Sequence, residues 1–404
     1  MRVSTLIPCT LLLLVTPARP AIAGDEAPDD LATLVADNNT FALQLHRELV
    51  DGDGNLFFSP TSISTALAMT YAGAEGATAE QMAAALRFTL PAERLHPAFG
   101  RLSGELMAPG QPYELAIANR LWGLHGMPFE EPFLATTREH YGAELVGVDF
   151  AGDAEGARRQ INAWVAEQTR DKILDLIPPG VLDALTRLVL TNAIYFKGTW
   201  AAQFDPADTE EQPFHKADGS TVQAPLMFQK GKFRYHESPG EWQLVRLPYE
   251  GERLEMVVLL PAAESSVAAL EASLGAAELD QWINSARRRD VKVWLPKFQM
   301  ESMRMLSQPM TKLGMVDAFS NKDADFDGIA KGQSLYITAI IHKAFVDVNE
   351  EGTEAAAATA VVIGARSVPP PPAEFRADRP FLFLIRDAET GSLLFVGRVM
   401  DPTG

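Results

Sequence analysis

Apolar residues recur along this chain at two spacings, one typical of helices and the other of strands. Apolar positions three or four residues apart predict amphipathic helices. These lie at 38–49, 63–71, 133–141, 153–170, 270–286 and 303–315, and another helix begins at Thr78. Short apolar runs between turn residues predict strands. These lie at 56–58, 114–122, 145–150, 188–200, 244–247, 256–260, 291–298, 335–348, 379–386 and 392–399. The mixture predicts an α+β protein.

Capping residues set the expected ends of several helices. Asn38 or Asn39 is expected to cap the first helix, and Ser59 the second, since these side chains accept hydrogen bonds from the first free N–H groups. The basic run 287–289 is expected to close the helix 270–286 as a solvated end, because cations are favourable at a helix C-terminus.

Composition and charge narrow the class of protein. The 404 residues are 47% hydrophobic and 22% charged, which is ordinary for a globular chain with a large core. The formal net charge is −18. A strongly acidic chain is a poor partner for nucleic acid or for an anionic membrane surface, so neither is expected.

The N-terminus has the pattern of a secretory signal. Arg2 is followed by an apolar segment at 6–15 and by the small-residue sequence Ala21-Ile22-Ala23. We therefore expect 1–23 to be a signal peptide, 24–37 a flexible acidic lead, and the protein to be secreted, outside the cell or into a periplasm. The single cysteine, Cys9, would leave with the signal, so no internal disulfide is expected.

The chain lacks the usual catalytic patterns. No Gly-x-Ser-x-Gly elbow, phosphate-binding loop or dinucleotide motif is present. The 7 histidines are scattered without partners at metal-ligand spacing. We expect no enzyme activity, no metal and no cofactor.

One stretch, 350–367, has features of two different conformations. Its four-alanine run, 355–358, favours a helix, whereas the β-branched run 361–363 favours a strand. No proline occurs from Gly352 to Ser367, so every residue keeps the N–H that a sheet interior requires. Such a segment could add to a sheet as a new strand.

The stretch resembles the reactive-centre loop of the serpins. The family's hinge is a Glu, then Gly, then Thr or Ser, then small residues; here these are Glu350, Gly352, Thr353, Ala355, Ala356, Ala357 and Ala358. The residue attacked by the protease usually lies 16 positions after the hinge Glu, which is Arg366, so the resemblance implies a reactive bond at Arg366-Ser367. The alternative is an Ala-rich solvated loop before the proline run 369–372.

Other short sequence motifs of the chain resemble those of serpins as well. The family's "shutter", the hydrogen-bonded cluster beneath its main sheet, corresponds to Ser59, Ser62, Asn192 and His342, and its "breach" tryptophan to Trp200. Two of these residues also have a plainer interpretation: Ser59 as a helix cap and His342 as a hydrogen-bonded core histidine. A buried Asn192 must in either case be hydrogen-bonded, or it costs ~1–3 kcal/mol.

The resemblance implies one domain and a specific architecture. It covers 38–402 and implies a single-domain serpin fold, with a large central mixed β-sheet, smaller sheets, about eight or nine helices and an exposed reactive-centre loop at 350–372. A monomer is expected, and no heparin site is evident among the scattered basic residues.

The implied function is suicide inhibition of a trypsin-like, arginine-specific serine protease. Arg366 would enter the protease's specificity pocket, and the cleaved loop would then insert into the main sheet and trap the acyl-enzyme. Three alternatives remain: a non-inhibitory serpin acting as carrier or chaperone, a hydrolase with an unrecognised site, and a loop that is cleaved without trapping. Ala365 departs from the glycine that precedes the arginine in the most similar loop, so trypsin is the expected target. The proline run after the bond also departs from the usual pattern.

Overall fold

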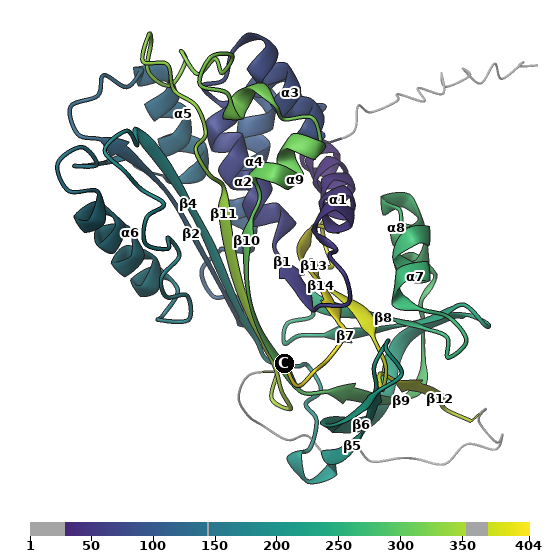
Figure 1. Cartoon of the computed structure of the whole chain (residues 1–404). Coiled ribbons are helices and arrows are strands. Elements are labelled where there is room, and N and C mark those ends of the chain that lie inside the picture. The colour runs from purple at the N-terminus through teal and green to yellow at the C-terminus, as the bar shows by residue number, and fades with distance from the viewer. Residues whose placement is uncertain (1–28, 144, 353–370) are drawn as a thin grey trace, which may run out of the picture.

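The computed structural model describes residues 29–143, 145–352 and 371–404, which form the helices and strands shown in Figure 1. The helices are α1 (Asp30–Leu49), α2 (Pro60–Tyr71), α3 (Gly76–Leu86), α4 (Ala92–Leu106), α5 (Glu131–Tyr141), α6 (Ala154–Gln168), α7 (Val267–Ser273), α8 (Ala276–Ser285), α9 (Ser307–Lys312), and the 3-10 turns η1 (Pro206–Asp208) and η2 (Asp317–Phe319). The strands are β1 (Leu56–Phe58), β2 (Tyr113–Leu124), β3 (Leu145–Val148), β4 (Leu188–Gly198), β5 (Glu210–His215), β6 (Thr221–Ser238), β7 (Trp242–Pro248), β8 (Leu254–Pro261), β9 (Arg287–Pro296), β10 (Phe298–Met305), β11 (Ile341–Val348), β12 (Ala373–Arg376), β13 (Phe381–Asp387) and β14 (Leu393–Val399).

The strands form two sheets. The first has five strands in the order β10-β11-β4-β2-β3 and is mixed, because β11–β4 and β2–β3 are parallel while the other pairs are antiparallel. The second has nine strands and runs from β1 through β14, β13, β8, β7, β6 and β9 to β12, with β5 beside β6. Together with nine described α-helices, this confirms the predicted α+β class with a large mixed sheet.

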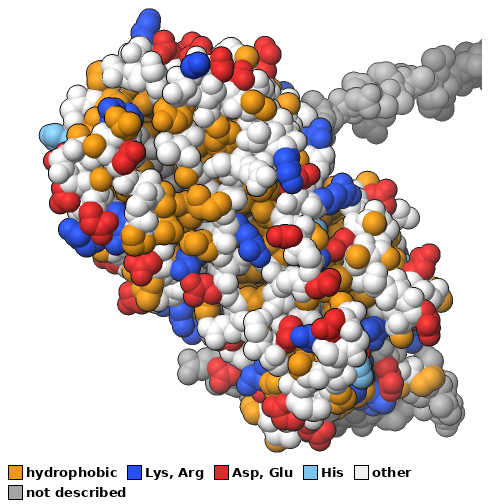
Figure 2. Space-filling view, viewed as in Figure 1, with side chains coloured by type: hydrophobic (Ala, Val, Ile, Leu, Met, Phe, Trp, Pro, Cys, Tyr) orange, Lys and Arg blue, Asp and Glu red, His pale blue; other side chains and the backbone are white. Residues whose placement is uncertain are grey.

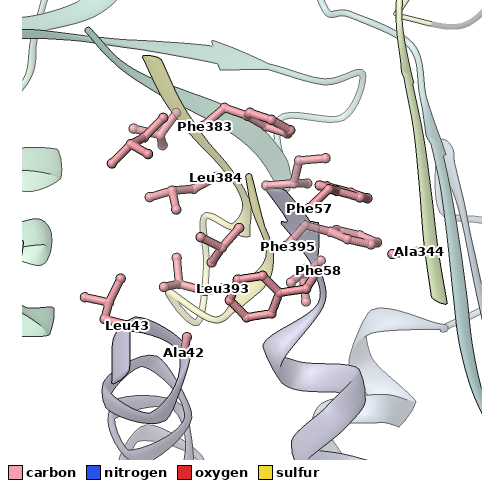
Figure 3. Close-up of a cluster of buried hydrophobic side chains, with 14 of the residues drawn as sticks. Ala42, Leu43, Phe57, Phe58, Ala344, Phe383, Leu384, Leu393 and Phe395 are labelled. Carbon is pink, nitrogen blue, oxygen red and sulfur yellow. The ribbon is translucent and has the colours of Figure 1, made fainter. Parts of the chain in front are cut away.

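The main hydrophobic core lies where β1 meets β13 and β14 (Figure 3). Phe57 of β1 stacks between Phe383 and Phe395, with ring centroids 5.7 and 5.1 Å away. All three rings are fully buried. Burying an aromatic side chain of this size stabilises a fold by roughly 1.5–3 kcal/mol, so the short apolar run 56–58 has an effect out of proportion to its length.

The five-stranded sheet is covered on both faces, as the near-continuous apolar sequence of β4 predicts. Along β4, Ile194 and Phe196 point into the main core, while Ala193 and Tyr195 point into a second cluster beneath α6. Alternate residues of a strand face opposite sides. Figure 1 shows α6 on one side of this sheet and α2 with its neighbouring helices on the other.

The N-terminal expectations need correction. Helix α1 begins at Asp30 and is capped by the Asp29 side chain, so the lead expected at 24–37 is helical from Asp30 onward. The apolar spacing of the helix continues back to Leu31, and this residue is buried. Asn38 and Asn39 therefore lie inside the helix and do not cap it. The expected signal peptide, 1–23, lies outside the described residues.

Three C-terminal expectations were also wrong in part. The segment 303–315 is not one helix, because β10 runs to Met305 and only α9 follows. The segment 270–286 is two helices, α7 and α8, separated at Leu274 and Gly275. The run 287–289 opens β9, although Arg287 still donates to the carbonyl oxygen of Asn284 at the end of α8.

Two further differences concern element length. The strand expected at 335–348 begins only at Ile341, and 335–340 belongs to no described strand. Helix α4 was not predicted, because Pro97 lies inside it and proline interrupts the usual helical pattern. The α4 side chains of Leu95, Phe99 and Leu102 are nevertheless buried in the main core.

The surface carries interspersed charges of both signs, with apolar side chains gathered mainly at the upper left of the view in Figure 2. Within the described ranges, no helix has the length and apolar character needed to span a membrane.

Candidate functional site

The neighbouring parallel strands β4 and β11 are paired along only part of their length. The ladder joins 192–195 of β4 to 342–345 of β11. Both strands then continue, to 198 and to 348, while their outer sides remain paired with β2 and β10. Among the described residues, the ladder between the two strands therefore stops short of 196–197 of β4 and of 346–348 of β11, and we call this interval of the sheet the opening.

The predicted shutter residues come together at the end of the ladder away from this opening. The Ser59 backbone N–H donates to His342 Nε2 over 3.0 Å, and His342 Nδ1 lies 2.9 Å from Asn192 Oδ1. The Asn192 amide nitrogen donates to the Ser62 carbonyl and to Asn119 Oδ1, each over 2.8 Å, and also contacts the Ser62 hydroxyl. These bonds tie β11, β4 and β2 to the start of α2, where the Ser59 hydroxyl also caps the helix.

The hydrogen bonds fix the protonation of His342. The Ser59 N–H can only donate, so Nε2 must be unprotonated and the proton lies on Nδ1, where the Asn192 oxygen accepts it. The ring is fully buried, and burial lowers the pKa of His342 to about 3. A second proton, on Nε2, would point at the Ser59 donor. The neutral ring is therefore the form that fits this cluster.

The predicted breach tryptophan lies just beyond the end of β4, on the side of the opening away from the ladder. The Trp200 indole N–H donates to the Asn349 carbonyl over 2.9 Å, and its backbone N–H donates to the Glu351 carbonyl over 3.2 Å. The indole also stacks on Tyr249, with centroids 4.5 Å apart and planes 10° apart. Trp200 therefore holds the chain where it leaves β11 and enters the predicted hinge.

The hinge residue Glu350 is held in a polar pocket. Its side chain accepts from the Thr209 hydroxyl over 2.8 Å and lies 2.8 Å from Lys297 Nζ. Burial by itself would raise the pKa of Glu350, but the bonds from Lys297 and Thr209 outweigh it and hold the pKa below its usual range. The Glu350 carbonyl also accepts from the Phe204 N–H. The charged carboxylate therefore anchors the start of the hinge.

Glycine is required at position 352 for two reasons. Its φ is +66°, a conformation that side chains other than glycine rarely adopt. A Cβ there would lie 2.2 Å from the Trp200 backbone nitrogen and 2.8 Å from the Gly198 carbonyl oxygen. The chain thus turns at Gly352 directly beside the end of β4.

The remaining predicted hinge and bond residues lie outside the described residues: Thr353, Ala355, Ala356, Ala357, Ala358, Arg366 and Ser367. The described chain resumes at residue 371, and β12 then pairs with β9 in parallel from Ala373. The described chain on either side of the predicted reactive segment is therefore held in place, by the contacts around Gly352 and by the pairing of β12 from Ala373.

Several contributing residues were missed by sequence reasoning. Asn119 stands as a polar residue inside the apolar strand β2, a pattern that could have pointed to the shutter. Lys297 lies between β9 and β10, and nothing in the sequence links it to Glu350. Thr209 and Tyr249 lie in the sequence without a local motif, and only the fold brings them to the hinge and to Trp200.

The described residues offer no group of three or more His, Cys, Asp or Glu side chains that could hold a metal ion. The buried His46 contacts Glu271, which also pairs with Arg398. His96 contacts the Tyr141 hydroxyl. Neither of these two histidines lies beside a serine or threonine in the contacts described. His215 Nδ1 lies 3.3 Å from the Thr221 hydroxyl, at an exposed position where β5 pairs with β6.

Comparison with known proteins gives a consistent result. A family model described as Serpin (serine protease inhibitor) matches residues 36–402. An uncharacterized serpin-like protein of Thermococcus kodakarensis is 42% identical over 367 residues, 90% of this chain and 84% of the relative. Leukocyte elastase inhibitor of Bos taurus is 42% identical over 378 residues, 91% of this chain and 99% of the relative.

Two further similarities extend this finding. Antithrombin-III of Homo sapiens is 39% identical over 375 residues, 90% of this chain and 81% of the relative. The crystal structure of uncleaved ovalbumin superposes with a TM-score of 0.83 at 32% identity, covering 91% of this chain and all of ovalbumin. With the family match across most of its length and relatives of this identity and coverage, the chain belongs to the serpin family of serine protease inhibitors.

Proposed function

We propose that this serpin is a secreted suicide inhibitor of trypsin-like serine proteases that is cleaved at Arg366-Ser367. The observation that carries the proposal is that the described ladder between β4 and β11 stops at 195 and 345, while the hinge turns at Gly352 beside the end of β4. The chain that leaves the hinge at Gly352 therefore starts near the interval in which the described ladder does not join these two strands. The small residues 355–358 then follow, and they could enter a sheet interior without crowding it.

The reaction proceeds through the protease's own chemistry. The protease's serine attacks the Arg366 carbonyl, the bond to Ser367 breaks, and the new amine leaves while Arg366 stays esterified to the protease. The freed segment then inserts as a strand between β4 and β11. Moving about 15 residues at ~3.3 Å each carries the protease roughly 50 Å, which distorts its active site before water can release it.

The residue at the reactive bond supports the protease class. The guanidinium of Arg366 fits a specificity pocket floored by a carboxylate, because the two groups form a charge-assisted pair. The relatives' names refer to leukocyte elastase and to thrombin, so relatives of this chain have different targets. An arginine at this position favours an arginine-specific protease here, with trypsin as the first probe.

Incubation with trypsin tests the proposal. We expect a covalent complex that survives SDS, together with release of the fragment beginning at Ser367. Arg366→Glu serves as the matched control, since it changes the residue that would enter the specificity pocket and leaves the hinge intact. Cleavage of the wild type at Arg366 with full recovery of trypsin activity would mean that the loop is a substrate and traps nothing. Absence of cleavage would favour a carrier or chaperone role.

A further inference from the structure

One area of the nine-stranded sheet gathers basic side chains on an otherwise acidic protein. We define the basic face as Lys230, Lys232 and Arg234 of β6 with Arg288 and Lys292 of β9. The register places Lys230 opposite Lys292 and Arg234 opposite Arg288. Alternate residues of a strand point to the same side, so all five side chains share one face of the sheet. The chain as a whole has a formal net charge of −18.

The carboxylates around this face neutralise it only in part. Lys292 pairs with Glu374 of β12 over 2.8 Å, and Lys232 lies 4.0 Å from Asp290. Among the described residues, Lys230, Arg234 and Arg288 have no carboxylate within 4 Å, and all three are exposed. Three cations therefore remain available to a charged partner.

The arrangement does not serve the stability of the sheet. Like charges directly opposite each other on neighbouring strands are destabilising. The face contains two such pairs, Lys230 with Lys292 and Arg234 with Arg288. A third arginine, Arg246 of β7, lies on the other side of Arg234 and is paired with Glu255. An exposed row of like charges that weakens its own sheet is better explained by contact with another molecule.

The face lies beside the C-terminal anchor of the reactive segment. Strand β12 pairs directly with β9 and begins at Ala373, six residues after Ser367, so the chain length keeps Ser367 within ~20 Å of this anchor. Neighbouring strands lie ~4.8 Å apart, which puts β6 only ~10 Å from β12. A standard interface of ~800 Å² per partner is a patch ~16 Å in radius. The reach of the chain therefore allows a protease seated on the bond to contact the basic face as well.

We propose that the basic face is a second contact surface for the target protease, and that this protease is acidic beside its active site. The proposal rests on the proposed function and adds the charge of the partner to it. Complementary charges steer two proteins together and mainly raise the association rate. The face is interrupted by Asp290 and Glu374, which a uniform polyanion would meet unfavourably. A folded protein surface can match both signs, so we choose a protein partner over a polysaccharide.

The test uses two trypsins of equal arginine specificity and opposite surface charge, anionic and cationic. The second-order rate of covalent complex formation is measured for the wild type, for Lys230→Glu/Arg288→Glu and for a matched control, Lys322→Glu/Lys331→Glu. The control residues are exposed lysines between η2 and β11, so the change in net charge is the same. We expect the first variant to react with anionic trypsin about tenfold more slowly at low salt, and the control less than twofold.

Two further conditions test the same prediction: a higher salt concentration and the cationic trypsin. The tenfold difference should shrink below twofold in 0.5 M NaCl, since surface electrostatics are screened. Cationic trypsin should react no more slowly with Lys230→Glu/Arg288→Glu than with the wild type. Equal slowing by both double variants would show an effect of net charge alone and overturn the proposal. If Lys230→Glu/Arg288→Glu reacts more slowly than the wild type only when heparin is added, the proposal is also overturned, because the face would then bind a polysaccharide.

Failure of the proposed function would be distinct from failure of this inference. If the wild type forms no covalent complex with either trypsin, the inhibitory function is wrong. Binding of anionic trypsin with its active-site serine replaced by alanine then tests the face directly. Weaker binding by Lys230→Glu/Arg288→Glu than by the control supports the basic face, and equal binding overturns it.

Discussion

Protonation of His342 should make the intact protein less stable below pH 6.5. Burial lowers the pKa of the ring to about 3, against an ordinary value of 6.5. Between these values the unfolded chain takes up a proton that the folded chain excludes, so folded stability is complete above pH 6.5 and declines as pH falls toward 3. At ~1.36 kcal/mol per pKa unit, the whole decline amounts to ~5 kcal/mol. Between pH 7.5 and pH 5.0, it amounts to ~2 kcal/mol.

The perturbation that isolates this effect is His342→Gln. Glutamine does not titrate, and its side-chain oxygen can still accept from the Ser59 N–H. His96 remains in both proteins; burial lowers its pKa to about 4, so its contribution cancels in the comparison. The measurement is urea unfolding of the intact form, followed by tryptophan fluorescence at pH 7.5 and pH 5.0. The wild type should lose ~2 kcal/mol more than the variant over this interval.

One result of the comparison between the wild type and His342→Gln would contradict the account of His342. If the wild type and His342→Gln lose the same stability between pH 7.5 and pH 5.0, then His342 does not titrate as a buried neutral ring. The hydrogen-bond roles assigned to Ser59 and Asn192 would then be wrong as well. The interval stops at pH 5.0 so that most carboxylates remain ionised in both proteins.

Three further predictions concern the hinge and the reactive bond. Gly352→Ala should lower the thermal midpoint more than Gly142→Ala does. Both positions have positive φ, but only at 352 would a Cβ meet backbone atoms. Equal midpoints for the two variants would refute the close approach of Gly352 to Trp200. Arg366→Glu should abolish trypsin inhibition with an unchanged thermal midpoint, and a large fall in the midpoint would show that the residue is not exposed. The form cleaved at Arg366-Ser367 should melt well above the intact form in calorimetry, since insertion adds a strand, whereas equal midpoints would mean that no strain is stored.

Much of the fold could be predicted because local patterns agreed with it. The apolar run of β4 predicted burial on both faces, and the structure places α2 and α6 there. Ser59 was expected to cap α2, and it does so. The failures have physical causes: Met303 and Met305 fit a helical pattern in sequence but lie in β10, where pairing with β11 decides the conformation.

The candidate site could be predicted only where its residues lie in a sequence motif that resembles the family's. Asn192, Trp200 and His342 could be found from their local sequences. The fold brings Asn192 and His342 together at the start of the β4–β11 ladder, and it places Trp200 where the chain leaves β11. Lys297 and Thr209 could not be linked to Glu350, because contacts between residues so far apart in sequence depend on the tertiary structure. The basic face could not be predicted from the sequence for the same reason, because only the pairing of β6 with β9 in the folded sheet brings its five side chains together.

The measurement that tests the central claim most directly compares Thr353→Arg with Glu354→Arg. Insertion would turn the side chain of Thr353 into the sheet and that of Glu354 toward water, because alternate residues of a strand face opposite sides. An unpaired guanidinium entering the sheet interior costs several kcal/mol, and every ~1.4 kcal/mol of added barrier slows insertion tenfold. Arg366 is unchanged in both variants, so both should still be cut.

The assay is residual trypsin activity as a function of the ratio of serpin to protease. Thr353→Arg should leave trypsin active and emerge cleaved, whereas Glu354→Arg should inhibit nearly as well as the wild type. If Thr353→Arg inhibits as well as the wild type, or if the two variants behave alike, then the loop does not insert between β4 and β11 in the way proposed.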